Sequence, residues 1–415
     1  MRRQAFTLIE LLVVIAILAV LAVVVVLTLN PAELLQESRD SNRISDMATL
    51  QSAISLSLGD NAAESLGSAN TVYVSIPDPS ATSTLGDQCQ GLGLISLPAT
   101  YAYHCAASST YQSTNGTGWI PVNLSQNAFG SSIPLLPKDP VNTSSSRLYY
   151  TYATDGNGKY EVTSAFESAK YNLGGSNDLI AGDGGTLASV YEKGSKLGLE
   201  PLDYGDNSLV GYWALDEGSG SIAYDYSGNN ATGSWNGTQA GTSGYYSPGK
   251  IGGWAGTAVG GADVNVPSPS FPAGMTSFTL TCWLDPSSFV NNWGGIIDWR
   301  DGSWPTMIDI ESGNNTVYGS VRNGTQSASP SYTIATSTWY SIAYVHNNVA
   351  TTDCLYANGL LIGCNSGVLT PQNATGTFAI GGNANLPLSG LISDVRVYNR
   401  ALSAAQIAAM YNGGK

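Results

Sequence analysis

The chain has 415 residues, more than one ordinary hydrophobic core holds, so its length favours two globular units. Its formal net charge of -14 argues against nucleic-acid binding, because neutralising phosphates requires clustered Lys and Arg. Only 11% of the residues are charged, whereas Gly numbers 48 and Tyr 23, a composition typical of secreted β-rich proteins.

The chain begins with a short basic leader and a long apolar run. The residues from Leu11 to Leu29 are apolar except for Thr28. Because a helix rises ~1.5 Å per residue, this run matches a hydrocarbon core of ~30 Å. The basic residues precede the run, which places the N-terminus in the cytoplasm by the positive-inside rule. The sequence therefore predicts a membrane helix over residues 8–29.

A secretory signal peptide is the main alternative for this segment. Signal peptides have a shorter apolar region of ~7 to 15 residues and a small-residue cleavage site behind it. Here the apolar run continues through Asn30-Pro31 into an amphipathic helix that ends near Gly59. An ordinary single-pass anchor also stays open, but it does not explain Glu10. An ionisable group at the start of a membrane span is costly and by default functional.

The residues from Ala5 to Ile15 resemble the class III leader and N-terminal helix of type IV prepilins and type II secretion pseudopilins. In that family a prepilin peptidase cuts before the Phe, methylates the new amine, and a Glu pairs with the N-terminus of a neighbouring subunit. The resemblance implies cleavage between Ala5 and Phe6, and it makes Phe6 and Glu10 the assembly residues. A buried carboxylate and ammonium neutralise each other and set the subunit register.

One departure from the family concerns the cleavage site. Prepilins usually have Gly before the cut, where this chain has Ala5. Because Ala is also small, we expect processing at reduced efficiency. The leader is then residues 1–5 and the N-terminal helix residues 6–59.

Residues 60–181 are expected to form a small pilin-like α+β head. Short β-like runs are Thr71 to Ile76, Trp119 to Val122, Leu148 to Tyr152 and Tyr160 to Thr163. Residues 155–158 read Asp-Gly-Asn-Gly and predict a hairpin turn, since Asn and Gly tolerate positive φ. Packed on the amphipathic helix, these runs give a small antiparallel sheet. Residues 182–207 show no sustained periodicity and are expected to be the interdomain linker.

The end of this head also resembles major pseudopilins, in which such a loop binds calcium. The likeness lies in residues 137–140, Pro-Lys-Asp-Pro, and in residues 174–178. Asp178 and Asp183, with Asn177, offer the hard oxygen ligands that Ca²⁺ prefers. Asn and Asp also favour turns without any ion, so both interpretations stay open.

Residues 208–415 consist of short alternating runs separated by Gly, Asn, Asp and Pro, as in an all-β sandwich. Several stretches resemble the concanavalin A-like jelly roll known as the laminin G-like domain. They are residues 209–218, 225–230, 278–284, 339–340 and 390–403. The predicted fold is therefore multidomain, with a long N-terminal membrane helix and an antiparallel pilin head followed by a concanavalin A-like β-sandwich. Ser403 is expected to cap a short final helix.

The laminin G-like resemblance implies a binding function. Such domains are mostly carbohydrate or protein binders, and many hold a structural calcium. Asp225, Asn229 and Asp394 are the candidate calcium ligands, with turn capping as the equally open alternative. Exposed Trp suits sugar faces, but burial in the core is the commoner fate of a Trp. The candidates for exposure are Trp235, Trp254, Trp293, Trp299 and Trp304.

The sequence argues against a glycosidase. Enzymes of this fold carry Glu-x-Asp-x-Glu on one strand, which sets two carboxylates ~5 Å apart as nucleophile and acid. The nearest match is residues 307–311, where Asp309 and Glu311 are present but Met307 replaces the first Glu. We therefore predict no enzymatic activity and no catalytic residues.

The cysteines predict two disulfides and one free thiol. Cys89 and Cys105 form one short-range couple, and Cys354 and Cys364 flank a predicted hairpin that sets them opposite each other. An oxidising compartment would close both. Strand alternation places Cys282 on an apolar face, where we expect a buried thiol.

These features predict a type IV pilin-like filament subunit, a minor pilin or adhesin, that displays a glycan- or protein-binding domain. The alternatives are a pseudopilin of a type II secretion or DNA-uptake machine, whose sandwich binds a partner, and a filament-displayed glycosidase. The expected partners are other pilin subunits, prepilin peptidase, the inner membrane and an extracellular glycan or matrix protein. The expected location is the bacterial inner membrane before assembly, then the periplasm and a cell-surface filament.

Overall fold

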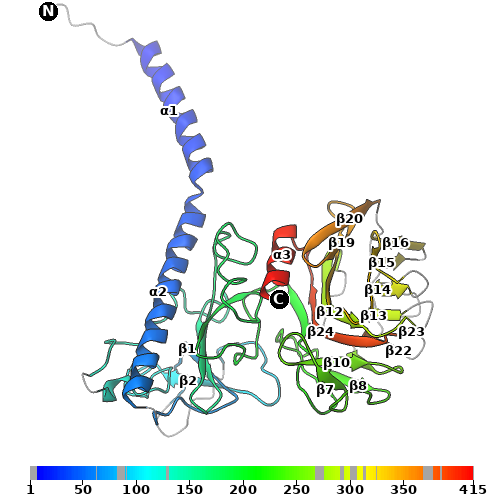
Figure 1. The fold of residues 1–415 in the computed structure, drawn as a ribbon. Helices are drawn as coiled ribbons and strands as arrows, with labels where there is room; N and C mark the ends of the chain where they lie inside the picture. The colour runs from blue at the N-terminus through cyan, green and yellow to red at the C-terminus, as the bar shows by residue number, and fades with distance from the viewer. Residues whose placement is uncertain are drawn as a thin grey trace, which may run out of the picture.

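The chain consists of an N-terminal helical part, an α+β head and a β-sandwich (Figure 1). The computed structural model describes residues 7–61, 63–81, 89, 91–127, 130–266, 275–289, 294–299, 306–311, 315–323, 325–367, 377–383 and 386–414. The helices are α1 (Leu8–Leu29), α2 (Pro31–Asp60) and α3 (Ala404–Gly413), with a 3-10 turn η1 (Leu124–Gln126).

The N-terminal helical part is two helices rather than one. Asn30 separates α1 from α2 with a left-handed φ of 38°, and Pro31 opens α2 at its first position. Proline suits the first turn of a helix because it has no N–H to leave unpaired, but it cannot continue the helix before it. The sequence therefore sets both a stop and a restart at this point.

The apolar side chains of α1 lie open over its described part. Leu8 is 76% exposed and Val20 is 65% exposed. Among the residues that the structure describes, no helix combines the length and the apolar character that crossing a membrane requires. The helix predicted over residues 8–29 is thus present, while its membrane span stays a prediction.

Helix α2 buries one face against the head. Met47, Leu50 and Ile54 are fully buried and follow the spacing of a helical stripe. They pack in a core that includes Trp119 and Tyr150. The amphipathic pattern read from the sequence is thereby confirmed.

The head sheet is larger than expected and is mixed. Its strands are β1 (Thr71–Asp78), β2 (Ala102–Ala107), β3 (Tyr150–Thr154), β4 (Tyr160–Ala165) and β5 (Val190–Gly194), in the order β2-β1-β3-β4-β5. The β1 and β2 strands run parallel, so the prediction of an antiparallel sheet is wrong at this edge. The turn expected at residues 155–158 does join β3 to β4.

One predicted strand of the head is absent. The residues from Trp119 to Val122 form an irregular segment rather than a strand. Trp119 is fully buried, and its indole N–H donates to the Pro137 carbonyl oxygen at 2.9 Å. The apolar run thus marks a buried loop, because a short apolar run does not by itself distinguish a strand from other buried backbone.

Residues 182–207 differ from the linker expected there. They contribute β5, which pairs with β4, and they bury Val190, Leu202 and Tyr204. Their acidic and small polar residues interrupt any apolar periodicity. Several of these carboxylates are buried as acceptors for backbone N–H groups, a role that composition does not reveal.

Two sheets make the C-terminal sandwich. The first holds β6 (Leu209–Trp213), β9 (Tyr246–Pro248), β10 (Trp254–Ala258), β12 (Phe278–Pro286), β18 (Tyr340–Asn347), β19 (Thr352–Ala357), β20 (Leu360–Ser366) and β24 (Gly390–Tyr398). The second holds β7 (Ile222–Ala223), β8 (Gly233–Asn236), β11 (Asp263–Val266), β13 (Gly294–Trp299), β14 (Thr306–Glu311), β15 (Thr316–Asn323), β16 (Thr325–Ala328), β17 (Tyr332–Thr333) and β21 (Phe378–Ile380). A short ribbon joins β22 (Gly382–Asn383) to β23 (Leu386–Pro387).

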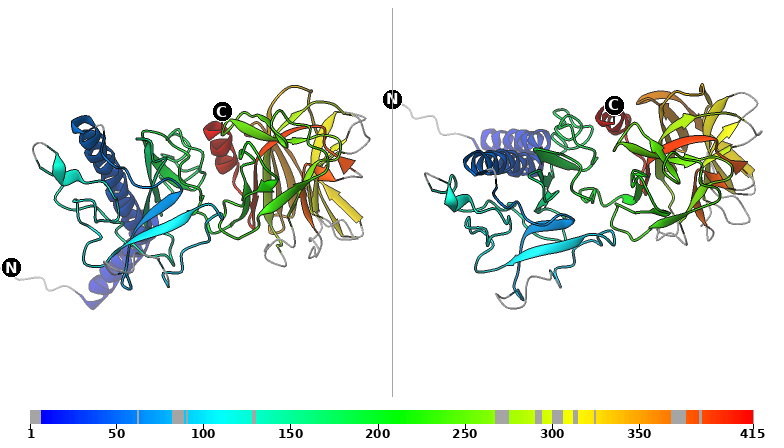
Figure 2. Two further views of the ribbon diagram at one scale, coloured as in Figure 1. Left: turned by 90° about the horizontal axis from the view of Figure 1, so that it is seen from below. Right: turned by 60° about the horizontal axis from the view of Figure 1, so that its bottom comes forward.

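The sandwich lies on the side of the head opposite α2 (Figure 1, Figure 2). Helix α3 lies between the head and the sandwich, so the C-terminus is next to their junction. Ser403 caps α3 as predicted, accepting from the Gln406 N–H at 3.2 Å. Ile407 of α3 is buried, which anchors the helix in this position.

Candidate functional site

The start of α1 presents a carboxylate held in a capping box. The Thr7 N–H donates to Glu10 Oε2 at 2.8 Å, and the Thr7 hydroxyl donates to the same oxygen at 2.9 Å. In return the Glu10 N–H donates to Thr7 Oγ1 at 3.3 Å. A capping box satisfies N–H groups that the first turn leaves open. Glu10 is exposed at the helix end, while Ala5 and Phe6 lie outside the described residues.

A buried arginine joins the sandwich to the head. Arg396 on β24 has a side chain that is 3% exposed. Its Nη1 lies 2.7 Å from Asp203 Oδ2, and its Nη2 donates to the Thr186 carbonyl oxygen at 2.9 Å. Within the sandwich, its guanidinium lies 4.0 Å from the ring centre of Tyr212 and contacts Asp394 at 2.9 Å.

The charges around this arginine keep it ionised. Burial alone would lower the pKa of Arg396, but Asp394, Tyr212, Tyr398 and Asp203 raise it well above its ordinary value. Guanidinium groups suit such sites because they are weakly hydrated and always charged. We call the contacts of Arg396 with Asp203 and Thr186 the joint.

Further contacts lie at the more exposed edge of the joint, which we call its rim. Arg400 Nη2 lies 2.7 Å from Asp206 Oδ2, and Arg400 Nε donates to the Ser208 hydroxyl at 2.7 Å. One apolar cluster also includes buried residues of both units, among them Tyr204 of the head and Val345 of the sandwich. Because the two units share packed side chains and buried hydrogen bonds, they form a continuous body at this junction.

The candidate calcium ligands of the sandwich all have other partners. Asp225 accepts N–H groups from Tyr212 at 3.1 Å and Ser227 at 2.9 Å. Its second oxygen accepts the Ala231 N–H at 2.9 Å. The Asn229 side chain donates to the Leu209 carbonyl oxygen at 3.2 Å. With donors directed at Asp225 and with Asp394 paired to a guanidinium, this set serves turns and the ion pair.

The candidate ligands of the head are also engaged. Asp178 accepts the Gly174 N–H at 2.8 Å and the Ile180 N–H at 2.9 Å. Asp183 accepts the Gly185 and Glu192 N–H groups, both at 2.8 Å. Burial raises the pKa of Asp183 to about 7.

No described group of three or more His, Cys, Asp or Glu side chains is arranged to hold a metal ion. Asp225, Asp178 and Asp183 instead accept backbone N–H groups, which is the turn-capping alternative left open by the sequence. Calcium binding at these residues stays a prediction from the sequence.

The strand that most resembles a glycosidase motif is present as β14. Asp309 stands opposite Tyr318 in the register with β15, and Glu311 stands opposite Thr316. Their side chains lie outside the described part of the structure.

The described Trp candidates belong to the core. Trp235 is buried, and its indole N–H donates to the Tyr246 hydroxyl at 3.1 Å. Trp254 and Trp299 are partly buried against the same core. Trp293 and Trp304 lie outside the described residues. The described Trp candidates are thus buried or partly buried in the core, as expected for most Trp residues.

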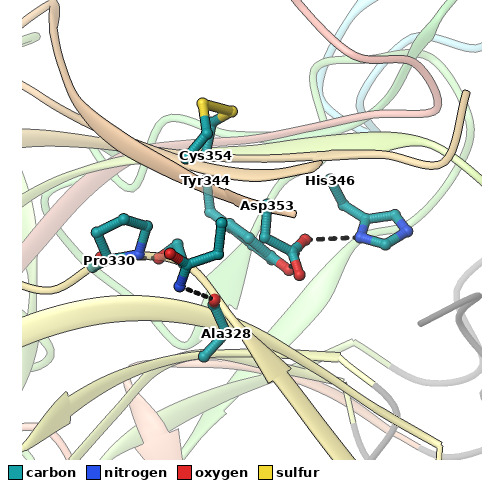
Figure 3. The surroundings of a disulfide bond; sticks show 9 residues. Ala328, Pro330, Tyr344, His346, Asp353 and Cys354 are labelled. Carbon is teal, nitrogen blue, oxygen red and sulfur yellow. Dashed lines mark hydrogen bonds and ion pairs between the residues drawn. A yellow bond between two sulfur atoms is a disulfide. The ribbon is translucent and has the colours of Figure 1, made fainter. Parts of the chain in front are cut away.

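Both predicted disulfides are formed, and Cys282 is a buried free thiol. Cys354 and Cys364 stand directly opposite each other in the register of β19 and β20. Figure 3 shows this bridge above a buried hydrogen bond, in which His346 Nδ1 lies 2.7 Å from Asp353 Oδ1. The Asn365 amide, next to Cys364, donates to the Ala328 carbonyl oxygen at 2.7 Å. The bridge therefore stands where the edges of the two sheets meet.

Comparison with known families matches both ends of the chain. Residues 1–26 match the prokaryotic N-terminal methylation motif. Residues 256–408 match the concanavalin A-like lectin/glucanases superfamily. The resemblances read from the sequence are thereby confirmed, and the chain joins a prepilin-type leader to a concanavalin A-like domain.

Solved structures of low similarity align over about half of the chain. Domain 4 of an extracellular arabinanase from Geobacillus stearothermophilus aligns at 21% identity and a TM-score of 0.40, over 49% of this chain and 98% of that one. The binding domain of botulinum neurotoxin DC aligns at 18% identity and a TM-score of 0.40, over 50% of this chain and 52% of that one. The comparison with curated proteins finds no match.

Proposed function

We propose that this protein is a subunit of a type IV pilus-like filament that displays its sandwich as a binding domain at the cell surface. The observation that carries the proposal is the joining of a methylation motif to a sandwich on the opposite side of the head from α2 (Figure 1). If α1 and α2 line the filament axis, the sandwich faces outward.

Helix α1 is the segment that anchors and assembles the subunit in this proposal. Apart from Glu10, its described side chains are exposed and apolar, and a continuous apolar surface of this kind marks an association site. The apolar sequence from Leu11 to Leu29 is long enough for a bilayer. The subunit then resides in the bacterial inner membrane before assembly and packs its α1 among those of other subunits afterwards.

Glu10 directs that packing. A carboxylate in an apolar helical bundle is tolerable only beside an opposite charge. Cleavage between Ala5 and Phe6 by prepilin peptidase supplies this charge as the new amine of Phe6 on a neighbouring subunit. The capping box with Thr7 holds Glu10 at the helix end, where such an amine can reach it.

Processing is the first test of the proposal. Mass spectrometry of the N-terminal peptide from membrane-extracted protein should find a chain that starts at Phe6 and carries a methylated amine. A chain that starts beyond Leu29 would identify a secretory signal peptide and end the filament proposal.

The displayed sandwich binds rather than cleaves its ligand in this proposal. Concanavalin A-like domains support both functions, and residue 307 is Met where the enzymes of this fold carry the first Glu. The ligand class is an extracellular glycan or a matrix protein. On a glycan array the purified chain should bind specific glycans, and chromatography of those glycans after incubation should show no hydrolysis. Release of shorter sugars would instead make the protein a filament-displayed glycosidase.

A pseudopilin of a secretion or DNA-uptake machine is the second candidate. It is favoured by Asp139 of the Pro-Lys-Asp-Pro segment, which lies 2.6 Å from Arg43 on α2 and so fastens a pseudopilin-like loop to the helix. A pseudopilus stays within the periplasm, so surface labelling of intact cells separates the two. A bulky second domain on every protomer would crowd a helical lattice, which favours a minor subunit in either case.

A further inference from the structure

An acidic segment forms the edge strand of the head sheet and packs over one of its faces. We call residues 183–204 the cover segment; it includes β5 and the loops on either side of it. Asp203 and Thr186, which bind Arg396 in the joint, both belong to it. The sandwich is therefore attached to the head through the cover segment.

Glu161 on β4 holds one end of the cover segment. Its side chain is fully buried. Its Oε2 accepts the Leu199 N–H at 2.6 Å and the Glu200 N–H at 2.8 Å. Its Oε1 is buried and has no hydrogen-bond partner.

Glu192 on β5 holds the other end. It is also fully buried, and its Oε2 accepts the Leu187 N–H at 2.9 Å. Its Oε1 likewise has no hydrogen-bond partner. Glu192 stands opposite Thr163 in the register of β4 and β5, two residues from Glu161 on the same strand face. Glu161 and Glu192 are therefore diagonal neighbours on one face of the sheet, which brings long side chains within reach of each other.

In the described part of the chain, the groups that contact these two carboxyls carry no positive charge. Asp183 accepts the Glu192 N–H, and Glu200 accepts the Thr151 hydroxyl at 2.5 Å. The ammonium of Lys193 lies 4.9 Å from the ring centre of Tyr191. Within the described part of the chain, neither Glu161 nor Glu192 forms an ion pair.

Two buried carboxyls in reach of each other cannot both be ionised without a cation. We infer that Glu161 and Glu192 share one proton between their Oε1 atoms, and that this hydrogen bond holds the cover segment, and with it the joint, closed until alkaline pH removes the proton. The proton leaves to solvent, and the two carboxylates then repel each other beneath the segment.

The direction of the pH dependence follows from proton linkage. Burial, and next the neighbouring Glu161, raise the pKa of Glu192 to about 11 from an ordinary value of 4.5. Between these values the closed state holds a proton that the open state has lost, so closing weakens as pH rises. For one retained proton, the ratio of the closed population to the open population of the segment falls up to about tenfold per pH unit. Burial raises the pKa of Glu200 to about 8, which adds to this slope below that pH.

Hydrogen–deuterium exchange of the full chain in detergent tests this inference. Protection of peptides from residues 185–203, corrected for the intrinsic exchange rate at each pH, should fall steadily from pH 6 to pH 9. Peptides from the buried face of α2 should keep their protection over the same range.

Conservative substitutions of Glu161 and Glu192 test whether these two residues carry the shared proton. Glu192→Gln supplies a permanent N–H donor to Glu161. The hydrogen-exchange protection of the cover segment should then depend on about one proton fewer, and the segment should stay protected at pH 9. Glu161→Gln should do the same from the other side. Glu64→Gln is the matched control, because Glu64 lies in the same head but bonds to Asn61 and Asn123, and it should keep the wild-type slope.

Three results would overturn the inference. They are protection in the wild type that does not change with pH, a Glu192→Gln variant that keeps the wild-type slope, and restoration of protection at pH 9 by Ca²⁺. The last result would mean that a cation, not a proton, bridges the two carboxyls.

Discussion

Helix α1 and the joint meet opposite requirements. Side chains such as Leu8 and Val20 of α1 are apolar and open, and the described part of the chain leaves them uncovered. At the joint, Arg396 is buried and has partners from both units. The first surface is left uncovered within one chain, whereas the second is already complete.

This contrast indicates how the protein divides its tasks. An exposed apolar surface marks a site of interaction with a membrane or with other proteins, and the proposed function assigns α1 to both. A satisfied polar joint fixes the orientation of the sandwich, because leaving one member of a buried charge pair alone is costly. Association at one end and fixed display at the other are what a decorated filament requires. Substitutions in one of these regions should leave the other region intact.

Glu10→Ala should have the largest effect. In a filament it leaves the Phe6 amine of a neighbour unpaired, at a cost of roughly 3 to 5 kcal/mol if that pair is buried. Since ~1.4 kcal/mol is a factor of ten, incorporation should fall a hundredfold or more. Immunoblots of sheared filaments and of membranes would measure it. The processed variant should accumulate in the membrane, Glu64→Ala should assemble normally, and wild-type levels of Glu10→Ala in filaments would remove the assembly role.

Arg43→Met should damage the head while leaving α1 intact. Arg43 is fully buried and lies 2.7 Å from Asp40 and 2.6 Å from Asp139. The substitution leaves these carboxylates buried without their cation, so we expect a loss of about 3 to 5 kcal/mol in unfolding free energy by urea titration. Arg39→Met is the control, because Arg39 is 33% exposed and its pair with Glu167 should contribute under about 1 kcal/mol. Similar losses in both variants would contradict the burial argument.

Arg396→Met should free the sandwich from the head. Asp203 would lose its guanidinium partner at the joint. We expect this loss to lower the free energy of docking between head and sandwich by about 3 kcal/mol and to expose the cover segment to protease. Limited proteolysis followed by mass spectrometry would locate the cut within residues 182–207. Arg400→Met at the half-exposed rim should cost under about 1 kcal/mol and leave the segment resistant. Equal resistance of both variants would show that apolar packing alone fixes the domains.

Glu217→Gln should change how the unfolding free energy of the sandwich depends on pH. Burial raises the pKa of Glu217 to about 7 from an ordinary value of 4.5. The folded state therefore keeps a proton that the unfolded state loses in this range, and wild-type stability should fall as pH rises from 4.5 to 7. Removing the group should reduce the slope by up to ~1.4 kcal/mol per pH unit. Urea titrations at several pH values measure the slope, and an unchanged slope would exclude Glu217 as its source.

Calcium removal should have the smallest effect. Asp225 and Asp178 already accept backbone N–H groups, so the geometry predicts that EDTA leaves the thermal unfolding midpoint unchanged. Scanning calorimetry with EDTA and with added Ca²⁺ measures this. A midpoint raised by Ca²⁺ and lowered by Asp225→Asn would restore the calcium site that the sequence left open.

The two ends of the chain could be predicted from the sequence because their signals are local. The Phe-Thr-Leu-Ile-Glu run and the spacing of Cys354 and Cys364 each act over a few residues. The family matches and the disulfide confirm them. The sequence predicts one N-terminal helix over residues 6–59, whereas the structure divides it at Asn30. The amphipathic pattern of α2 is likewise a property of one helix.

The joint and the cover segment could not be predicted, because their signals are distant in sequence. Arg396 stands in the recognisable closing block of the sandwich, but its partner Asp203 is 193 residues away. Glu161 and Glu192 look like ordinary surface residues in the sequence. Only the pairing of β4 with β5 brings them together and shows that residues 182–207 are packed.

The most direct test of the account is imaging of filaments with a label on the sandwich. Electron microscopy with gold-conjugated antibody against residues 208–415 should show the wild-type label on surface filaments, set away from the filament axis. Cells that produce Glu10→Ala should show label only at the cell envelope. Wild-type label confined to the envelope, with unlabelled filaments, would contradict the proposal that this chain is a displayed filament subunit.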